Sequence, residues 1–221
     1  MVNKGEEGLD KYSIEKWQEI MNVTQMNYSN MLRRLEIKSK ISNYILIYYS
    51  IFLITISLAC KYFPDKFDNS FVEYFNIMLS VIVLAYSLIN DNANYRERIV
   101  NIEKSLNEVK DIRRKLDDNN FRILIRDYND IVNKTEKRED RDFYHTINQL
   151  KEKCRSIEEY GNSDEQYEKQ LKRWKKKVND YLSEVNRIYI WIEMAIEFVW
   201  HILLFVTPII IMLFSMYRTK V

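Results

Sequence analysis

Glycine, proline and cysteine are scarce in this chain of 221 residues, at three, two and two residues. Tight turns favour glycine and proline, so their scarcity argues against β-sandwiches and glycine-rich phosphate loops. Cys60 ends an apolar run and Cys154 lies in a charged region. We therefore expect two unpaired thiols rather than a disulfide framework or a metal site. The formal net charge is only +2, which is too balanced for a dedicated nucleic-acid-binding protein.

The chain does contain uncharged runs long enough to cross a membrane. Residues 41–60 carry no charge, and a helix of that length matches the roughly 30 Å thickness of a bilayer core. Residues 74–90 form a second, shorter uncharged run. Two such runs with a short connection predict an antiparallel transmembrane hairpin over residues 41–90. Its spans are expected at about 41–62 and 71–90.

The connection between the two runs, residues 61–73, contains Pro64 and is predicted to be a short loop, with Asn69 or Ser70 capping the second helix. Lysine and arginine are frequent just outside both ends of the hairpin, whereas acidic residues offset the two lysines of the loop. The positive-inside rule then predicts that both ends face the cytoplasm. The region that follows, residues 91–187, would be cytoplasmic.

Amphipathic helices are predicted on both sides of the hairpin. Residues 1–40 form an N-terminal cytoplasmic helix, for which Ser13 is the N-cap candidate. After the second span, apolar residues recur at steps of three and four among charges. This pattern is typical of a helix with a coiled-coil-like seam, which we expect to continue directly out of the second span. Residues 117–120 break this helix, and a shorter one follows over 121–133.

The last predicted helix carries a longer seam. Ser163 and Gln166 form a capping box that opens it. Its apolar positions alternate steps of four and three over more than three heptads, and we expect this seam to hold copies of the chain together as a homo-oligomer. The seam consists of Tyr167, Leu171, Trp174, Val178, Tyr181, Val185, Ile188 and Ile192.

The seam leads into a third apolar segment, residues 198–217, which has no formal charge apart from one that His201 can carry. It is either a membrane segment or a buried core helix, and its hydrophobicity favours the membrane. We expect a C-terminal membrane helix over residues 188–221, with Pro208 kinking or breaking it. The segment either crosses once or is re-entrant.

Each hairpin span carries polar side chains on one helical face, because their spacing follows the helical turn. Polar atoms in hydrocarbon need partners, so both stripes should face protein or water rather than lipid. They serve either as hydrogen-bonding contacts between helices or as the lining of a pore formed by several hairpins. The candidates are Asn43, Ser50 and Ser57 in the first span, and Asn76, Ser80, Ser87 and Asn90 in the second.

Two further clusters have more than one interpretation. Glu193, Glu197 and His201 share one helical face, and they form either the polar side of a helix entering the membrane or a gate. A metal site is the third alternative, but one helix supplies too few ligands, and we expect none. A basic run near Trp174 is either a solvated face or a surface for anionic lipid or an anionic nucleotide signal. Its members are Lys172, Arg173, Lys175, Lys176 and Lys177.

No residue pattern indicates catalysis. His145, Cys154 and the nearby acids do not form a recognisable nucleophile arrangement, and nothing matches a P-loop, a zinc motif or a Rossmann turn. We therefore expect that the chain is not an enzyme, uses no cofactor and binds no nucleic acid directly.

Three features carry a resemblance to a known family: the residues that lead into the first span, the hairpin with its charged extension, and a motif in the middle of the chain. Together they resemble the SLATT superfamily, small bacterial proteins with two transmembrane helices and a cytoplasmic helical part, over roughly residues 10–160. The motif is similar to that of the fifth SLATT subfamily, except that Lys137 and Arg138 replace an Asn-His pair and Phe143 replaces a tyrosine. The matching residues are Thr24, Arg34, Leu35, Ser42 and Ser50, followed in the motif by Tyr128, Ile131, Val132, Thr135, Glu136, Glu139, Asp140 and Asp142.

The resemblance implies a function. SLATT proteins are regarded as pore-forming effectors of prokaryotic conflict systems, found beside nucleotide-signal synthetases, SLOG sensors or, in the fifth subfamily, reverse transcriptases. An upstream signal would open a pore in the inner membrane and stop an infected cell, as antiviral defence. The expected partners are membrane lipid and other copies of the chain. The alternative, from a different functional class, is a membrane-anchored helical scaffold or adaptor without a pore.

Overall fold

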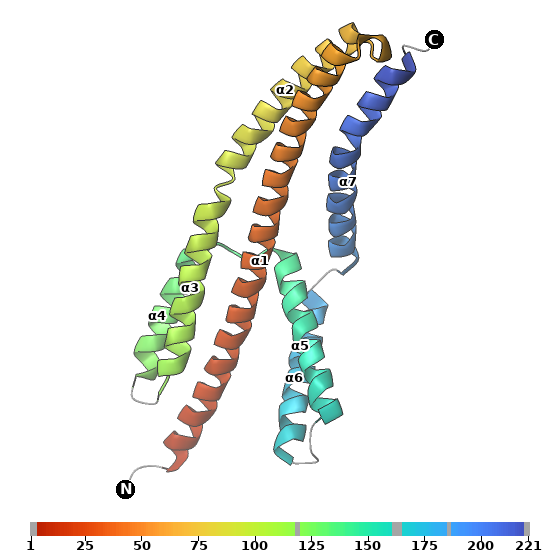
Figure 1. The fold of residues 1–221 in the computed structure, drawn as a ribbon. Helices are drawn as coiled ribbons and strands as arrows, with labels where there is room; N and C mark the ends of the chain where they lie inside the picture. The colour runs from red at the N-terminus through yellow and green to blue at the C-terminus, as the bar shows by residue number, and fades with distance from the viewer. Residues whose placement is uncertain (1–3, 118–119, 161–164, 185–186, 219–221) are drawn as a thin grey trace. The chain divides into compact units, whose positions relative to one another are not determined.

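The structure, a computed structural model, consists of helices joined by short connections (Figure 1). It describes residues 4–117, 120–160, 165–184 and 187–218, and these contain no strand. The predicted all-α fold class is confirmed. In chain order the elements are α1 (Lys4–Tyr62), the 3₁₀ turn η1 (Pro64–Lys66), α2 (Asn69–Asn92), α3 (Tyr95–Lys115), α4 (Phe121–Lys134), α5 (Asp140–Tyr160), α6 (Glu165–Glu184) and α7 (Arg187–Arg218).

The chain forms two compact units. We call the first the charged unit; it comprises Met1–Leu35 and Glu97–Ile190. The second, the membrane unit, comprises Glu36–Arg96 and Trp191–Val221. Helix α1 is continuous from Lys4 to Tyr62, so its first part belongs to the charged unit and its second part to the membrane unit.

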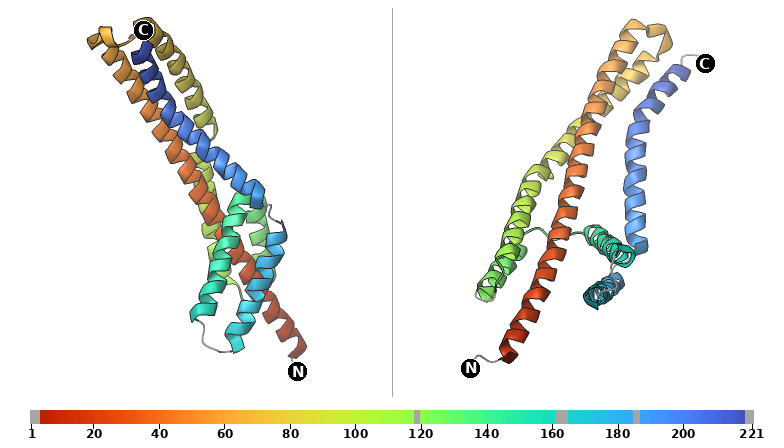
Figure 2. Two further views of the ribbon diagram at one scale, coloured as in Figure 1. Left: turned by 90° about the vertical axis from the view of Figure 1, so that its right-hand side faces the viewer. Right: turned by 60° about the horizontal axis from the view of Figure 1, so that its bottom comes forward.

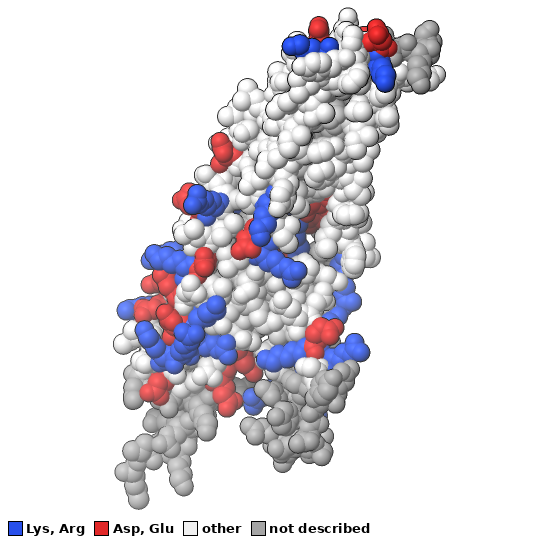
Figure 3. All heavy atoms as spheres, viewed as in Figure 1, with Lys and Arg blue, Asp and Glu red and all other residues white. Residues whose placement is uncertain are grey.

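Three of the described helical segments are long and apolar enough to cross a membrane, as predicted. They belong to α1, to α2 with α3, and to α7. Only 11% of the most apolar stretch of α7 is buried inside the chain, so α7 is not a buried core helix. Figure 3 shows the same property as a nearly uncharged surface over α2, α7 and the second part of α1, with charged residues at the hairpin loop. The protein is therefore a membrane protein.

In the membrane unit, α2 and α7 both pack on α1, and the views of Figures 1 and 2 agree on this arrangement. One buried cluster joins Ile45 and Tyr49 of α1 to Leu79 of α2, and side chains of α7 pack against it. A second cluster lies beside the loop and includes Phe67 and Val72. Most other side chains of these helices are exposed in the single chain, where lipid or another protein surface would cover them.

The hairpin loop is shorter than predicted, because α2 begins at Asn69. The capping residue is Asp68, whose Oδ1 accepts a hydrogen bond of 3.1 Å from the backbone N–H of Phe71. The prediction of Asn69 or Ser70 as the cap was wrong, since both lie inside the helix. A carboxylate at this position also interacts favourably with the positive end of the helix dipole.

The second span does not continue directly into the charged helix that follows it. Helix α2 ends at Asn92, and the backbone turns at Ala93 and Asn94 before α3 begins. Asn94 has φ of 45°, the left-handed region that asparagine tolerates better than most residues. The prediction of one uninterrupted helix was therefore wrong.

In the charged unit, α1 has partners on different sides. The ring of Trp17 packs edge-on against that of Tyr128 in α4, with 5.8 Å between their centroids. Arg113 of α3 donates a hydrogen bond to Asn22. Helix α5 contacts α1 mainly through polar groups, which are described below. The apolar core includes Met21, Met31, Leu35, Ile102, Val109, Ile147 and Leu150.

The seam of the last predicted helix is used inside the chain rather than between copies. Trp174 and Val178 are 4% and 6% exposed, and α6 packs on α5. The ring of Phe143 lies 5.1 Å from that of Tyr181. The prediction that this seam joins copies was therefore wrong: its central positions are already covered. Ile188, at the end of the seam, lies in α7 and is 74% exposed.

Other predicted helix boundaries also changed. Ser13 lies within α1 and is not its N-cap, because the helix begins at Lys4. Helices α6 and α7 are separate elements, whereas one helix was predicted. Pro208 lies inside α7 without ending it, so the broken-helix alternative was wrong. The predicted capping box of Ser163 lies outside the described residues.

Val178→Asp should unfold the α5–α6 contact. An unpaired carboxylate at this buried position should cost about 3 kcal/mol or more, the usual penalty of an uncompensated buried charge. Amides of α5 should then exchange with solvent about a hundredfold faster in the detergent-solubilised chain. Asn179→Asp adds the same charge at the next, exposed position and should leave exchange unchanged. Equal protection in both variants would contradict the assignment of this seam to the α5–α6 contact.

Candidate functional site

Polar contacts join the two helices of the hairpin at both of its ends. At the end away from the loop, Ser42 donates a hydrogen bond of 2.6 Å to Oδ1 of Asn90, and its hydroxyl lies 3.1 Å from that of Tyr86. Near the loop, Nδ2 of Asn76 donates to Oγ of Ser57 over 3.0 Å. The structure thus places Asn76 and Asn90 in contacts between α1 and α2. Such bonds hold helices together where water is absent.

The remaining stripe residues are not used in this way. Asn43, Ser50 and Ser80 are exposed in the single chain, and Ser87 is half-buried. The hydroxyls of Ser50 and Ser80 donate to backbone carbonyl oxygens four residues earlier, at 2.8 and 2.7 Å. One face of α1 therefore presents Asn43 and Ser50, which have no hydrogen bond to α2 among the described residues, together with Ser57, which is exposed but bonded to Asn76.

The three polar residues of α7 lie in its first half. Glu193 is exposed, while Glu197 and His201 are half-buried. Nδ1 of His201 lies 2.5 Å from the backbone carbonyl oxygen of Glu197, so this nitrogen is engaged with the helix itself. Among the described residues, no group of three histidine, cysteine or acidic side chains could hold a metal ion.

The basic run of α6 is partly paired within the charged unit. Arg173 lies 3.3 Å from Glu15 of α1, and Lys175 forms an ion pair with Glu158 of α5. Lys172 and Lys176 are exposed, and the side chain of Lys177 lies outside the described residues. The pairing favours a solvated helix face over a dedicated binding surface for anions.

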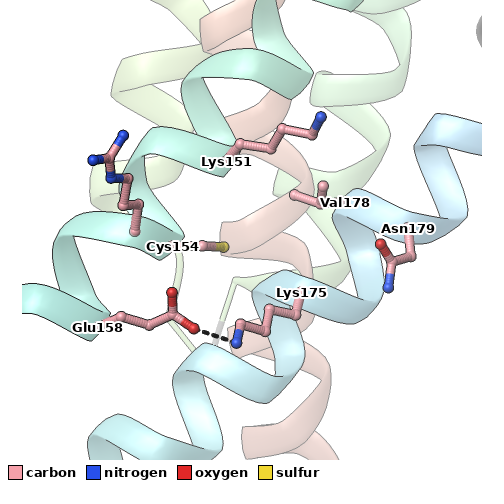
Figure 4. A pocket seen from close by; sticks show the side chains of 7 residues that line it. Lys151, Cys154, Glu158, Lys175, Val178 and Asn179 are labelled. Atoms are coloured by element: carbon pink, nitrogen blue, oxygen red, sulfur yellow. Dashed lines mark ion pairs between the residues drawn. The ribbon is translucent and has the colours of Figure 1, made fainter.

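A shallow cavity of about 300 Å³ lies between α5 and α6 (Figure 4). The side chain of Cys154 points into it, and the ion pair of Glu158 with Lys175 closes one end. Burial raises the pKa of the Cys154 thiol, with the charge of Glu158 acting in the same direction. A thiol with a raised pKa is a weak nucleophile at neutral pH. Cys154 is therefore a weak nucleophile in this cavity.

The most specific arrangement in the charged unit is a buried ion pair. Nε of Arg34 in α1 donates to both carboxylate oxygens of Asp142 in α5, over 2.9 and 3.2 Å. Arg34 also forms an ion pair with Glu139, just before α5. The side chains of Arg34 and Asp142 are only 7% and 1% exposed. Breaking such a pair would leave a charge buried without its counterion.

A second arginine binds the same acidic segment. Arg98, near the start of α3, donates to Oε2 of Glu136 over 2.8 Å. This hydrogen bond is the main reason that the pKa of Glu136 lies below its ordinary value; burial opposes it, and the charges of Arg98 and Arg34 assist it. Because folding lowers this pKa, the ion pair of Glu136 adds to the stability of the folded state. This stabilisation is complete at neutral pH and is lost as the pH falls from the ordinary carboxyl pKa through the lowered pKa of Glu136.

We call these five residues, Arg34, Arg98, Glu136, Glu139 and Asp142, the acidic clasp. The segment between α4 and α5 supplies Glu136 and Glu139, while the arginines come from the extensions of both hairpin helices. Within the charged unit, the clasp therefore fixes α1 and α3 to one short segment.

Uncharged polar groups surround the clasp. Asn30 of α1 donates to Oγ1 of Thr146 over 2.9 Å, and Thr146 donates to Asn27 over 2.7 Å. Further along α1, the hydroxyls of Thr24 and Tyr128 are 2.7 Å apart. Both members of this last pair belong to the residues that carried the family resemblance, and the fold brings them together. The asparagines were not predicted, because nothing in the local sequence identifies their partners in α5.

The positions that depart from the fifth-subfamily motif lie beside the clasp. The guanidinium of Arg138 lies over the ring of Phe143, 3.6 Å from its centroid. Two of the replacements therefore contact each other through a cation–π interaction. Lys137 is exposed.

Arg34→Met should destabilise the charged unit by about 3–5 kcal/mol, because it leaves Asp142 buried without its cation. Arg33→Met changes the neighbouring exposed arginine and should alter the stability by less than about 0.5 kcal/mol. The double variant Arg34→Met with Asp142→Leu should be more stable than Arg34→Met alone. Thermal unfolding of the full chain in detergent measures all three. Equal melting temperatures of the Arg33 and Arg34 variants would show that the ion pair of Arg34 with Asp142 does not stabilise the charged unit.

Comparison with known proteins identifies the family. A family model described as the SMODS and SLOG-associating 2TM effector domain family 5 matches residues 10–214. The match extends well beyond the resemblance seen in the sequence and includes most of α7. No curated protein and no solved structure matches the chain. The family is one of membrane effectors and is not a known catalytic family. The chain belongs to the SMODS and SLOG-associating 2TM effector domain family 5, the fifth SLATT subfamily.

Proposed function

We propose that this protein is an effector that permeabilises the inner membrane of a prokaryotic cell when an upstream component of a conflict system signals to it. The family description names SMODS and SLOG as associated components, and these are the upstream partners that we propose. In this proposal several copies assemble through their membrane units. The charged unit lies in the cytoplasm and receives the signal.

The observation that carries the proposal is the exposed polar face of α1, of which only Ser57 is bonded to α2 among the described residues. Asn43, Ser50 and Ser57 are all exposed in the single chain, although their helix belongs in a membrane. Two of the three hydroxyl and amide groups bond to their own backbone, which lowers the cost of contact with lipid. A polar face along the span nevertheless favours water or another subunit over hydrocarbon. Neighbouring copies that present this face inward would form a wetted path.

The acidic clasp provides a way to control such a path. Arg34 lies about two helical turns before residue 41, and Arg98 lies in the first turn of α3, which follows α2 after the turn at Ala93 and Asn94. Both arginines are held by Glu136 and Glu139, so the extensions of the two hairpin helices cannot separate while the clasp is closed. A signal received by the charged unit would act by changing these contacts.

The pore face is tested by bulky apolar substitutions. Asn43→Leu and Ser50→Leu should abolish depolarisation of cells after induction, because the new side chains narrow the path and remove its wetting groups. Thr55→Leu is the matched control: Thr55 is also exposed and bonds its own backbone, but lies about 140° around the helix from Ser50. The Thr55→Leu variant should depolarise cells to the same extent as the parent. Depolarisation is measured with a potential-sensitive dye and normalised to the amount of membrane-inserted oligomer.

Other outcomes separate this proposal from its rivals. If Asn43→Leu and Ser50→Leu assemble and still depolarise cells, this face does not form the path. If they fail to assemble or accumulate poorly, the face serves in packing instead; Asn76→Leu, which loses the bond to Ser57 across the hairpin, is the reference for poor accumulation. If the parent never depolarises cells, even beside its neighbouring genes and during phage infection, the membrane-anchored scaffold is the better description.

The proposed orientation is tested by cysteine labelling. In a variant without Cys60 and Cys154, Asn69→Cys at the start of α2 should react with a membrane-impermeant reagent in intact cells. Asn101→Cys, exposed in α3, should react only after lysis. The reverse pattern would place the charged unit outside the cell and refute the orientation.

A further inference from the structure

Helix α7 makes a specific polar contact with α1 inside the membrane unit. The hydroxyl of Tyr49 donates a hydrogen bond of 2.8 Å to the backbone carbonyl oxygen of Leu204. The hydroxyl of Tyr48 donates one of 2.9 Å to the carbonyl oxygen of Phe205. The rings of Tyr48 and Phe205 also pack against each other at a tilt, with 5.3 Å between their centroids. Two neighbouring tyrosines of one span therefore hold two neighbouring carbonyls of another.

Pro208 explains why a carbonyl is free at this point. In an α-helix the carbonyl of residue i accepts from the N–H of residue i+4, so Leu204 would be bonded by residue 208. Proline has no N–H, and its ring also pushes on the carbonyl four residues earlier. The carbonyl of Leu204 thus loses its partner inside α7. The hydroxyl of Tyr49 replaces that partner from α1.

The location makes this replacement important. In a bilayer no water can solvate a free carbonyl, so a proline in a span is tolerated where a neighbouring helix supplies a donor. Tyr49 is only 6% exposed, and Leu204 packs against the cluster that contains it. The side chain of Pro208 is also fully buried. The proline and the carbonyl that it leaves without an N–H partner are therefore turned toward α1 and not toward lipid.

We propose that Tyr48 and Tyr49 clamp α7 to α1 at the carbonyls just before Pro208, and that this clamp restrains the membrane unit in its resting state. The restraint rests on the proposed function, whereas the clamp itself does not. Helix α7 can leave α1 only when the carbonyl of Leu204 and the two phenol hydroxyls find other partners, namely water or another subunit. Opening of a pore that moves α7 away from α1 would therefore have to replace these hydrogen bonds with others.

A second buried group on α7 works against docking. The side chain of Ser215 is 0% exposed, and its Oγ has no hydrogen-bond partner among the described residues. The neighbouring Phe214 packs its ring 5.4 Å from that of Phe71 in α2, so this part of α7 lies against the hairpin. A buried hydroxyl without a partner destabilises the arrangement that buries it. Ser215→Ala should therefore strengthen the docking that Tyr49→Phe weakens.

A double-mutant cycle tests the clamp in the purified full chain. Tyr49→Phe should lower the melting temperature in detergent, because it removes the donor to Leu204. In the Pro208→Ala background, Tyr49→Phe should lower the melting temperature by less than half as much. The N–H that residue 208 gains then donates to the carbonyl of Leu204. Tyr44→Phe, on an exposed tyrosine earlier in α1, is the control and should have no effect. Equal losses of melting temperature in both backgrounds would overturn the assignment of Tyr49 as the replacement donor for the carbonyl of Leu204.

Depolarisation tests the restraint separately. Tyr49→Phe should depolarise cells at a lower level of induction than the parent, and Ser215→Ala should require a higher one. If the melting temperatures couple as expected but both variants depolarise cells at the parent's level, the clamp is structural and the restraint is refuted. If neither the parent nor any variant depolarises cells, the proposed function and the restraint both fail. The double-mutant cycle of melting temperatures still shows whether Tyr49 bonds the carbonyl of Leu204.

Discussion

The absence of water from the core of a membrane is the constraint on which most of this structure depends. Every backbone N–H and C=O group in that region must be bonded within the protein. This explains why the spans are continuous helices and why the irregular backbone lies at their ends, at the Asp68 cap and at the Asn94 turn. Pro208 is the one proline within the helices that could cross a membrane, and there the carbonyl that it frees meets Tyr49.

The charged unit is organised by a different requirement, the pairing of buried charge. Burying Arg34 and Asp142 costs desolvation, and the cost is offset only because the two bond each other and Arg34 also binds Glu139. Such a pair fixes the register of α5 on α1 more narrowly than apolar contacts do. The most constrained part of the charged unit therefore lies on the extensions of the two hairpin helices.

Apolar periodicity predicted the helices well but not their partners. The seam through Trp174 and Val178 was predicted from its spacing, yet α5 covers it within the same chain. Heptad spacing predicts that an apolar face is covered, but it does not identify the surface that covers it. The polar stripes show the same difference, since Asn76 and Asn90 bond across the hairpin while Ser50 stays exposed. Spacing alone could not separate these roles, because all of these residues lie on predicted polar faces.

The sequence by itself determined that the protein is helical and enters a membrane, because uncharged runs and helical periodicity are local properties of the chain. It also placed the motif that resembles the fifth SLATT subfamily. Only the tertiary structure decided that Arg34 pairs with Asp142 and that Tyr49 bonds the carbonyl freed by Pro208. These partners are separated by more than a hundred residues, and their contact depends on how whole helices pack against one another.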